Sequence, residues 1–366
     1  MVYRILRALR QGMDELFLGL LRKLIPASVA WGPPKGFFSA YELLESGKLE
    51  GKVLLRSQDV PPAAPESLRR KSRLEQDLYQ PWPVFWTLHP EARLIAKSLG
   101  LLDGRKRLSQ EGAFGPPAES DPAWRSVFLP RATRLAGNWT SITGRWAEGY
   151  YHWFLDALPR LALLPELPPD TRIIVPPRLA PFQQQTLQWL GLENRVRPSG
   201  ETNLLIERFY FCPPTSMTGC YNPFAFQFLR RSFLPRADPK YEAPPRFYLR
   251  RVGKVRPIVN EDEVLDFFRN RGWAIIDTEQ LQLAQQIGLF SRAEMICAPH
   301  GAGLTNLLWC PPGCKVLELC ASTFLNGVYE GLADWLGLRH RYLIFEGDNT
   351  FQSRIHLQEV ERALEY

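Results

Sequence analysis

The sequence has no paired CxxC metal signature, no nucleic-acid-binding motif and no secretory signal at its start. Charged side chains interrupt residues 1–24, so a long uncharged run and a small-residue cleavage site are both missing there. The six cysteines stand mostly in apolar context, and no second ligand pair follows Cys310 and Cys314. These absences argue against a zinc site and predict reduced core cysteines in a cytosolic protein.

An excess of positive charge is present instead, with 45 Lys and Arg against 38 Asp and Glu, a net charge of +7 and a pI near 9.1. This balance suits an anionic ligand or an anionic membrane surface. The basic residues are spread out, so we expect no nucleic-acid partner. The length of 366 residues predicts two domains, and 11 Trp and 21 Phe suffice for sizeable cores.

Residues 1–24 carry apolar side chains at every third or fourth position, which predicts an amphipathic helix with basic flanks. This helix either docks on the protein's own surface or lies on the anionic inner face of a membrane. We therefore expect a helix and linker over residues 1–34. The expected location is cytoplasmic, and peripheral at the inner membrane face if the helix binds lipid.

Residues 293–319 contain the most informative pattern of the chain. An apolar run at 295–298 predicts a buried strand, 304–309 has helical spacing, and 316–319 predicts a second strand. Gly301 and Gly303, in the turn between the first strand and the helix, let backbone amides approach a ligand. A helix that begins after such a turn directs its free N–H groups at an anion, so the pattern predicts a phosphate site, or else only a tight connection.

The second half of the chain alternates strands and helices, which predicts a parallel, doubly wound sheet. Expected strands lie at 246–249, 273–276, 295–298, 316–319 and 341–345. The ligand crevice of such a sheet lies at the C-terminal ends of its strands. The basic loop 250–256 leaves the first strand at that end, so Arg251 and Arg256 are expected to grip phosphate oxygens across from the glycine turn.

A second region, residues 149–161, places His152 and Asp156 one helical turn apart on one face. A histidine within reach of a carboxylate can act as a general base with its orienting partner. The residue pattern alone also fits a structural His–Asp pair. The strands and helices around this region predict a first α/β unit.

The chain resembles the glycosyltransferase family 61 proteins, specifically their bacterial branch, in four features that together span residues 148–320. They are Tyr151-His152-Trp153-Phe154-Leu155-Asp156 with Leu158-Pro159-Arg160; Tyr248, Arg251, Arg256, Asn260 and Glu261; Gln286; and His300-Gly301-Ala302-Gly303-Leu304-Thr305-Asn306 with Glu318. The resemblance implies an α/β protein of two Rossmann-like domains in a GT-B arrangement, inversion at the anomeric carbon and no metal. We expect an acceptor-side domain at 35–240, a nucleotide-sugar domain at 241–350 and a terminal helix at 351–366.

The resemblance and the residue pattern together imply a role for each site residue. The expected donor-binding residues are Arg251, Arg256, His300, Gly301, Ala302, Gly303, Leu304, Thr305, Asn306 and Glu318, the last for the ribose hydroxyls. Asp156 is the expected base, with His152 as an open alternative. The donor is a nucleoside-diphosphate sugar, no other cofactor is needed, and the acceptor is a glycan or glycolipid of polysaccharide biosynthesis. A non-catalytic nucleotide- or polyanion-binding module is the rival interpretation.

Overall fold

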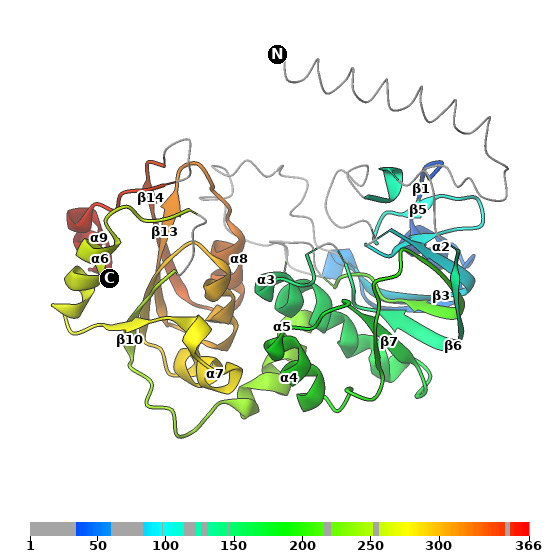
Figure 1. Cartoon of the computed structure of the whole chain (residues 1–366), viewed down its shortest axis with the longest axis horizontal. Helices are drawn as coiled ribbons and strands as arrows, with labels where there is room; N and C mark the ends of the chain where they lie inside the picture. The colour runs from blue at the N-terminus through cyan, green and yellow to red at the C-terminus, as the bar shows by residue number, and fades with distance from the viewer. Residues whose placement is uncertain are drawn as a thin grey trace, which may run out of the picture.

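A computed structural model of the chain describes residues 34–59, 83–96, 98–112, 122–125, 131–144, 146–215, 221–251, 256–347 and 352–365. The predicted amphipathic helix of residues 1–24 lies outside these ranges. The strands form two sheets, one on each side of a central group of helices (Figure 1). Strands of the first sheet come from residues 37–211 and those of the second from residues 246–345. The domain limits given above stay a prediction.

The first sheet is mixed. In the described part of the chain it contains β1 (Phe37–Phe38), β2 (Gly51–Leu55), β3 (Val84–Ile95), β4 (Gly100–Leu102), β5 (Leu108–Ser109), β6 (Thr133–Ser141), β7 (Arg172–Val175), β8 (Val196–Pro198) and β9 (Asn203–Phe211). Their order is β1-β5-β4-β3-β9-β6-β7-β8, with β2 paired to β3. The pairs within β9-β6-β7-β8 and the short pair β1-β5 are parallel, whereas β2, β4 and β9 run antiparallel to β3.

This sheet differs from the Rossmann-like sheet expected for the first half, and connection length gives the reason. Four residues, 96–99, join β3 to β4, which is too short for the crossover that a parallel pair requires. Helical segments join β6 to β7 and β7 to β8, and those strands are parallel. The α/β class is confirmed, while the first unit is only partly of the doubly wound type.

The second sheet is parallel throughout, as predicted. It contains β10 (Arg246–Leu249), β11 (Ala274–Ile276), β12 (Met295–Pro299), β13 (Lys315–Ala321) and β14 (Arg339–Phe345), in the order β11-β10-β12-β13-β14. From β10 the chain first adds β11 on one side and then β12 on the other. The switch point of this order, where a ligand crevice is expected, therefore lies between the C-terminal ends of β10 and β12.

Helices fill the space between and around the sheets. They are α2 (Ala40–Glu45), α3 (Tyr150–His152), α4 (Pro181–Trp189), α5 (Pro223–Phe233), α6 (Glu261–Arg269), α7 (Leu283–Ser291), α8 (Val328–Trp335) and α9 (Leu357–Leu364). The structure also describes one π-helix, η6 (Trp153–Ala157). Its 3₁₀ helices are η1 (Ser57–Asp59), η5 (Pro122–Arg125), η7 (Leu158–Glu166), η8 (Leu234–Arg236), η9 (Thr278–Gln280) and η10 (Ala302–Trp309). None of the helices in the described ranges is long and apolar enough to span a membrane.

The helix predicted at 304–309 begins two residues earlier and is a 3₁₀ helix, η10. Cys310 and the prolines at 311–312 follow it and end the helix. All cysteines of the described residues are buried and unpaired, namely Cys212, Cys297, Cys310, Cys314 and Cys320, as the sequence predicts.

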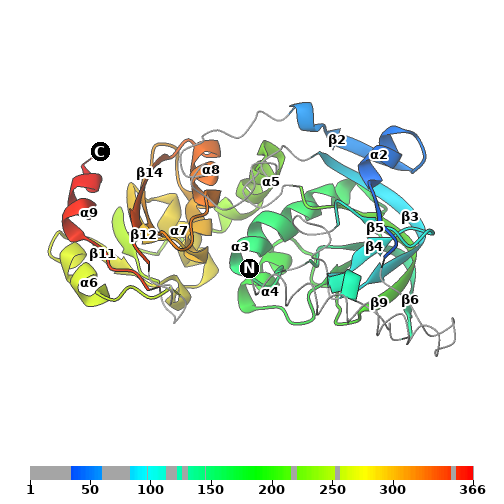
Figure 2. The ribbon, with the colours of Figure 1, turned by 90° about the horizontal axis from the view of Figure 1, so that it is seen from above.

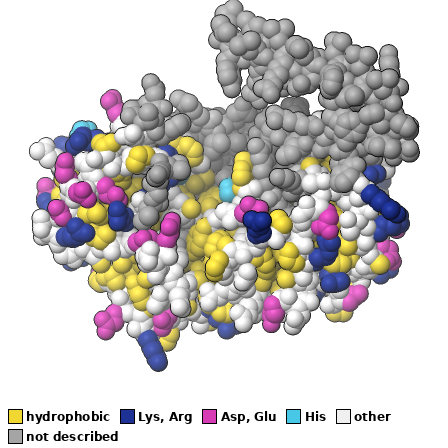
Figure 3. Space-filling view, in the orientation of Figure 1, with side chains coloured by type: hydrophobic (Ala, Val, Ile, Leu, Met, Phe, Trp, Pro, Cys, Tyr) yellow, Lys and Arg dark blue, Asp and Glu magenta, His cyan; other side chains and the backbone are white. Residues whose placement is uncertain are grey.

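One hydrophobic core joins the two halves. It contains Trp153, Phe154 and Phe233 from the first half and Phe290 and Trp309 from the second. Helices α3, α4 and α5 of the first half lie beside α7 and α8 of the second in both views (Figures 1 and 2). Hydrophobic side chains are also visible on the surface where the halves meet (Figure 3). Helices α6 and α9 pack on the other face of the second sheet around a separate core.

Candidate functional site

A crevice opens at the switch point of the second sheet. Its volume is about 290 Å³, and segments that follow three neighbouring strands line it. These segments contribute Arg250 and Arg251 after β10, residues 277–279 after β11, and Gly301–Gly303 after β12. The described start of the loop after β10, Arg250 and Arg251, therefore faces the glycine turn, as predicted. Arg251 bridges them directly, because its Nη1 donates to the carbonyl oxygen of His300 at 3.0 Å.

The arginines around this crevice differ in how their charge is balanced. Arg250 makes a two-point ion pair with Glu261, at 2.9 and 3.1 Å. Arg251 and Arg256 are half-buried, and no carboxylate is among the groups that shift their pKa values. Burial, followed by the positive charge of Arg256, lowers the pKa of Arg251 to about 10. Arg251 lines the crevice, whereas Arg256 lines an adjoining pocket with Arg251 and His300. Two partly desolvated cations that have no carboxylate partner among the described residues favour an anion.

Arg256 is positioned by its backbone and by an aromatic ring. Its φ of 57° is left-handed, which is uncommon for a residue with a side chain. Its guanidinium lies 4.0 Å from the ring centroid of Phe324, in a cation–π arrangement. The ring of Phe324 is also 5.5 Å from that of His300. Residues 252–255, between the two arginines, lie outside the described ranges.

The glycine turn provides N–H donors to the crevice, and its two glycines differ in how closely other side chains pack against them. Gly301 is extended, and a side chain there would meet Arg251 only at an ordinary 3.8 Å. At Gly303 an added Cβ would lie 3.0 Å from a methyl group of Leu249, a close contact that the leucine would have to relieve. No backbone bond within the described residues uses the N–H of Gly301, Ala302 or Gly303, and these groups lie at the crevice wall.

Three residues expected to touch the donor are turned inward instead. Leu304, Thr305 and Asn306 are all buried in the described structure. A 3₁₀ helix that begins at Ala302 places them against the core after less than one turn. The N–H of Leu304 already donates to the carbonyl of Gly301 at 3.0 Å. Of the expected backbone donors, only the N–H groups of residues 301–303 therefore remain available to an anion.

Asn306 anchors a hydrogen-bond network between the halves. Its Oδ1 accepts from the hydroxyl of Tyr150 at 2.8 Å and from Trp309 Nε1 at 3.0 Å. Its Nδ2 donates to Gln286 Oε1 at 3.0 Å, and Gln286 Nε2 donates to the carbonyl of Thr278 at 2.9 Å. Tyr150, Gln286 and Asn306 also line a pocket of about 790 Å³, which shares residues 278–279 and 302–303 with the crevice.

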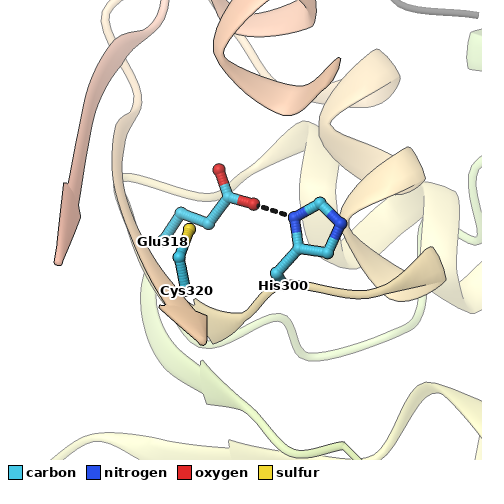
Figure 4. Close-up of side chains that lie close together, drawn as sticks. All are labelled: His300, Glu318 and Cys320. Carbon is cyan, nitrogen blue, oxygen red and sulfur yellow. Dashed lines mark hydrogen bonds and ion pairs between the residues drawn. The ribbon is translucent and has the colours of Figure 1, made fainter. Parts of the chain in front are cut away.

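His300 is held by Glu318, which in turn holds a second histidine. His300 Nδ1 lies 2.5 Å from Glu318 Oε1, and His340 Nε2 lies 2.9 Å from Oε2 (Figure 4). Burial raises the pKa of Glu318, but its bonds to both histidines outweigh burial and bring that pKa to about 2. The carboxylate is 0% exposed and both oxygens are engaged. The expected contact between Glu318 and ribose is therefore wrong: this carboxylate positions His300.

His300, Glu318 and Cys320 are also close enough to be considered as metal ligands, since their ligand atoms lie within 4.8 Å of one another (Figure 4). The donor set does not fit a metal well. Both oxygens of Glu318 already accept hydrogen bonds from histidines. Burial raises the pKa of the Cys320 thiol well above its usual value, which disfavours the thiolate that a metal binds. The cluster is better described as a hydrogen-bonded support for His300.

In the first half, His152 and Asp156 meet as their spacing predicts. His152 Nδ1 lies 2.5 Å from Asp156 Oδ2. Helix α3 ends at His152 and continues as the π-helical turn η6, which carries Asp156. Such π-turns are frequent at functional sites. The structure therefore confirms the contact between the two side chains, although the helix that carries them is irregular.

His152 and Asp156 differ in how far their side chains are buried, and this difference indicates a different role for each. The side chain of His152 is 23% exposed and that of Asp156 only 3%. Burial is the largest influence on Asp156 and raises its pKa, against the opposing effects of His152 and Arg160. Arg160 is itself buried and donates to the carbonyl oxygens of Cys212 and Thr143, at 2.6 and 3.1 Å. Solvent thus reaches the histidine, so Asp156 orients the base and His152 is the base candidate, opposite to the expected assignment.

A chain of aromatic contacts connects His152 to the anion site. Ring centroids are 5.1 Å apart between His152 and Tyr151, 5.9 Å between Tyr151 and Tyr329, and 5.1 Å between Tyr329 and His300. Only two tyrosine rings therefore separate the histidine of the first half from the histidine of the second. Sequence reasoning missed Tyr329, and no local pattern around it marks this role.

Histidine, arginine and glycine groups from two halves, gathered at the switch point of a parallel sheet, define a candidate anion site in an α/β protein. The sequence profile of the glycosyltransferase 61 family matches residues 150–317, which contain His152, the arginine pair and the glycine turn. The resemblance to the glycosyltransferase 61 family that the sequence motifs indicate is thus confirmed over residues 150–317.

Two relatives are similar to part of this chain. An EGF domain-specific O-linked N-acetylglucosamine transferase of Drosophila melanogaster is 31% identical over 140 residues, which are 36% of this chain and 26% of the relative. A beta-1,2-xylosyltransferase of Oryza sativa subsp. japonica is 29% identical over 126 residues, which are 31% of this chain and 22% of that protein. The chain therefore spans about a quarter of the length of the relatives that it matches.

Proposed function

We propose that this protein is an inverting glycosyltransferase that moves a sugar from a nucleoside-diphosphate donor to a hydroxyl of a glycan or glycolipid. The observation that carries the proposal is the half-buried pair Arg251 and Arg256, which no carboxylate of the described residues neutralises. Arg251 reaches the glycine turn, and Arg256 lines an adjoining pocket together with Arg251 and His300. A diphosphate supplies the charge that this pair lacks. The names of both relatives describe sugar transfer, which supports the same class of reaction.

The donor diphosphate binds in the crevice at the switch point. The N–H groups of Gly301, Ala302 and Gly303 donate to its oxygens, and the two guanidinium groups offset the charge that grows as the diphosphate leaves. The arginines thus perform the task that a divalent cation performs in other transferases. We propose metal independence on this ground, and treatment with a chelator is expected to leave turnover unchanged.

His152 removes the acceptor proton. With Asp156 accepting from Nδ1–H, the neutral imidazole carries its lone pair on Nε2. The acceptor oxygen attacks the anomeric carbon as Nε2 takes its proton, and the bond from that carbon to the diphosphate oxygen breaks on the opposite face. This single in-line displacement inverts the anomeric centre. Asp156 then stabilises the imidazolium that forms.

The remaining parts of the proposal concern arrangement and setting. The second sheet serves as the nucleotide-sugar unit and the first as the acceptor unit of a GT-B type arrangement. The basic charge of the chain suits an anionic donor and a role in polysaccharide biosynthesis at the cytoplasmic face of a membrane, with residues 1–24 as the contact.

The test is a panel of nucleoside-diphosphate sugars, each incubated with the protein while free nucleoside diphosphate is measured. We expect one donor to be turned over by the wild-type protein and not by His152→Ala. The anomeric configuration of the product, read by NMR, is expected to be opposite to that of the donor. Tight binding of a donor without any release of nucleoside diphosphate would instead support the rival, a non-catalytic nucleotide-binding module.

A further inference from the structure

Trp146 is unusually placed for a large hydrophobic residue. Its side chain is 51% exposed, and its φ of 70° is left-handed. A bulky residue held in this conformation indicates backbone strain, which folded proteins keep mainly at functional positions. The turn that holds it is closed by bonds from Ala147 N to Gly144 O and from Gly149 N to Trp146 O. The fold thus holds an indole ring at the surface in a strained turn.

The indole lies on the candidate base. The ring centroids of Trp146 and His152 are 5.3 Å apart, with the ring planes inclined by only 30°. The second exposed aromatic ring of the described residues, Phe324 at 41%, adjoins His300 and Arg256 in the other half. Each histidine of the site therefore has an exposed aromatic ring beside it. Because the anion site lies at Phe324, Trp146 is the ring on the acceptor side.

We propose that Trp146 forms an acceptor subsite that stacks an uncharged sugar ring next to His152. This inference rests on the proposed transferase function and specifies its acceptor as a glycan recognised by a pyranose ring. The C–H face of such a ring packs on an indole face, while the hydroxyls at its rim point past the indole edge toward the adjacent imidazole. A sugar ring held on the exposed indole therefore lies close to the candidate base, which favours transfer to one of its hydroxyls.

The surroundings of Trp146 favour a sugar over a lipid chain. Among the described residues, the only other exposed large hydrophobic side chains are Val259 and Phe324, and Glu148, two residues after Trp146, is exposed and charged. An acyl chain requires a continuous apolar groove, whereas a sugar ring requires one apolar face and a polar rim. A lipid-linked acceptor therefore binds here through its glycan part.

The test compares three variants with the wild-type protein. Trp146→Asn removes the indole and suits the left-handed backbone, Trp146→Phe keeps an aromatic face, and Val259→Asn changes an exposed hydrophobic residue outside the site. The probes are neutral trisaccharides of glucose, xylose and N-acetylglucosamine, added to protein saturated with the nucleoside diphosphate of its donor. Binding is measured by saturation-transfer NMR and titration, with thermal stability and donor hydrolysis in parallel.

We expect at least one trisaccharide to bind, with its affinity reduced by about tenfold or more in Trp146→Asn and retained in Trp146→Phe and Val259→Asn. The melting temperature of Trp146→Asn is expected to equal or exceed that of the wild type, because strain is relieved. Unchanged trisaccharide affinity in Trp146→Asn would overturn the subsite, as would a wild type that hydrolyses donor but binds no probe. Failure of the transferase function itself would appear separately, as absent donor hydrolysis in the wild type.

Discussion

At the scale of single residues, the site consists of two histidines that are each oriented by a buried carboxylate. Asp156 holds His152 and Glu318 holds His300, both through Nδ1. The two carboxylates differ in their surroundings. Glu318 has two histidine partners and a lowered pKa, whereas Asp156 has one, its Oδ1 lacks a partner among the described residues, and its pKa is raised. The two pairs therefore respond to pH in opposite directions.

Replacing the two members of the first pair is expected to separate activity from stability. His152→Ala and Asp156→Asn should each lower kcat by about 10²–10⁴, because the first removes the base and the second its orientation. The folded-state pKa of Asp156 is raised, so its contribution to stability is present at low pH and is lost as pH rises through that pKa. Asp156→Asn should therefore keep or raise the melting temperature at pH 8. A variant with wild-type turnover would contradict the assignment.

The pair of His300 and Glu318 predicts that the folded protein loses stability in acid. The pKa of Glu318 falls from 4.5 to about 2 on folding, so its stabilisation is complete above pH 4.5 and is lost as pH falls toward 2. Full loss of this stabilisation lowers the free energy of unfolding by an amount on the order of 3 kcal/mol. Glu318→Gln lacks this contribution at every pH. Urea denaturation should therefore show the gap between wild type and variant shrinking between pH 5 and pH 3, with the exposed Glu346→Gln as control. A constant gap would show that Glu318 does not titrate in this way.

At the scale of elements, the turn from β12 into η10 decides where an anion can sit. Gly301 lines the crevice and tolerates a side chain, whereas Gly303 packs against Leu249 of β10. Arg251 reaches the same turn from the end of β10 through the carbonyl of His300. The two strands that border the switch point thus build the anion site together.

Alanine substitutions at the two glycines should give contrasting results. Gly303→Ala forces a Cβ to 3.0 Å from Leu249, and we expect a loss of about 1–3 kcal/mol in unfolding free energy. Gly301→Ala should leave stability unchanged but weaken binding of a nucleoside diphosphate, because its methyl group stands beside the stem of Arg251. Thermal denaturation and binding titrations on both variants check this. Equal melting temperatures for the two variants would count against the packing argument.

The sequence predicts elements well where the pattern is local. The strands of the second sheet and the order of its helices follow from apolar runs separated by glycine and proline, and they lie within a few residues of the expected positions. The mixed pairing around β3 depends on which distant strand it meets, and no local pattern records that. The role of Glu318 could not be predicted for the same reason. It is buried between His300 and His340, and His340 lies on the neighbouring strand β14. Trp146 was missed because its exposure and left-handed turn appear only in the fold.

At the scale of the whole molecule, the two halves share one core and a hydrogen-bond network. Residues from both sheets' helices form a single hydrophobic cluster, and Tyr150 of the first half bonds to Asn306 of the second. A shared core opposes independent opening of the halves, because separation would expose apolar surface. The contact between Tyr151 and Tyr329, which links the two histidine sites, is fixed by the same packing.

This arrangement predicts cooperative unfolding. Calorimetry of the wild-type protein should show one transition for both halves. Asn306→Ala leaves the Nε1 of Trp309 without its acceptor and removes the shorter of two hydroxyl bonds of Tyr150, whose other acceptor is Gln286 Oε1 at 3.2 Å; the change should cost about 1–3 kcal/mol. The single transition should move to lower temperature without splitting. Gln188→Ala, in the exposed wall of the adjoining pocket, serves as the control and should have little effect. Two separate transitions in the wild type would show that the halves are independent.

The most direct test of the central claim is calorimetric titration with uridine and guanosine diphosphates. The wild type, Arg251→Ala, Arg256→Ala and Arg250→Ala are compared under identical salt conditions. Each arginine of the pair is expected to contribute about 1.5–3 kcal/mol through charge-assisted bonds, so each of its variants should bind the preferred diphosphate about 10- to 100-fold more weakly. Arg250→Ala, which removes a guanidinium already paired with Glu261, should bind nearly as tightly as the wild type. Wild-type affinity in both Arg251→Ala and Arg256→Ala would contradict the claim that this pair holds the diphosphate.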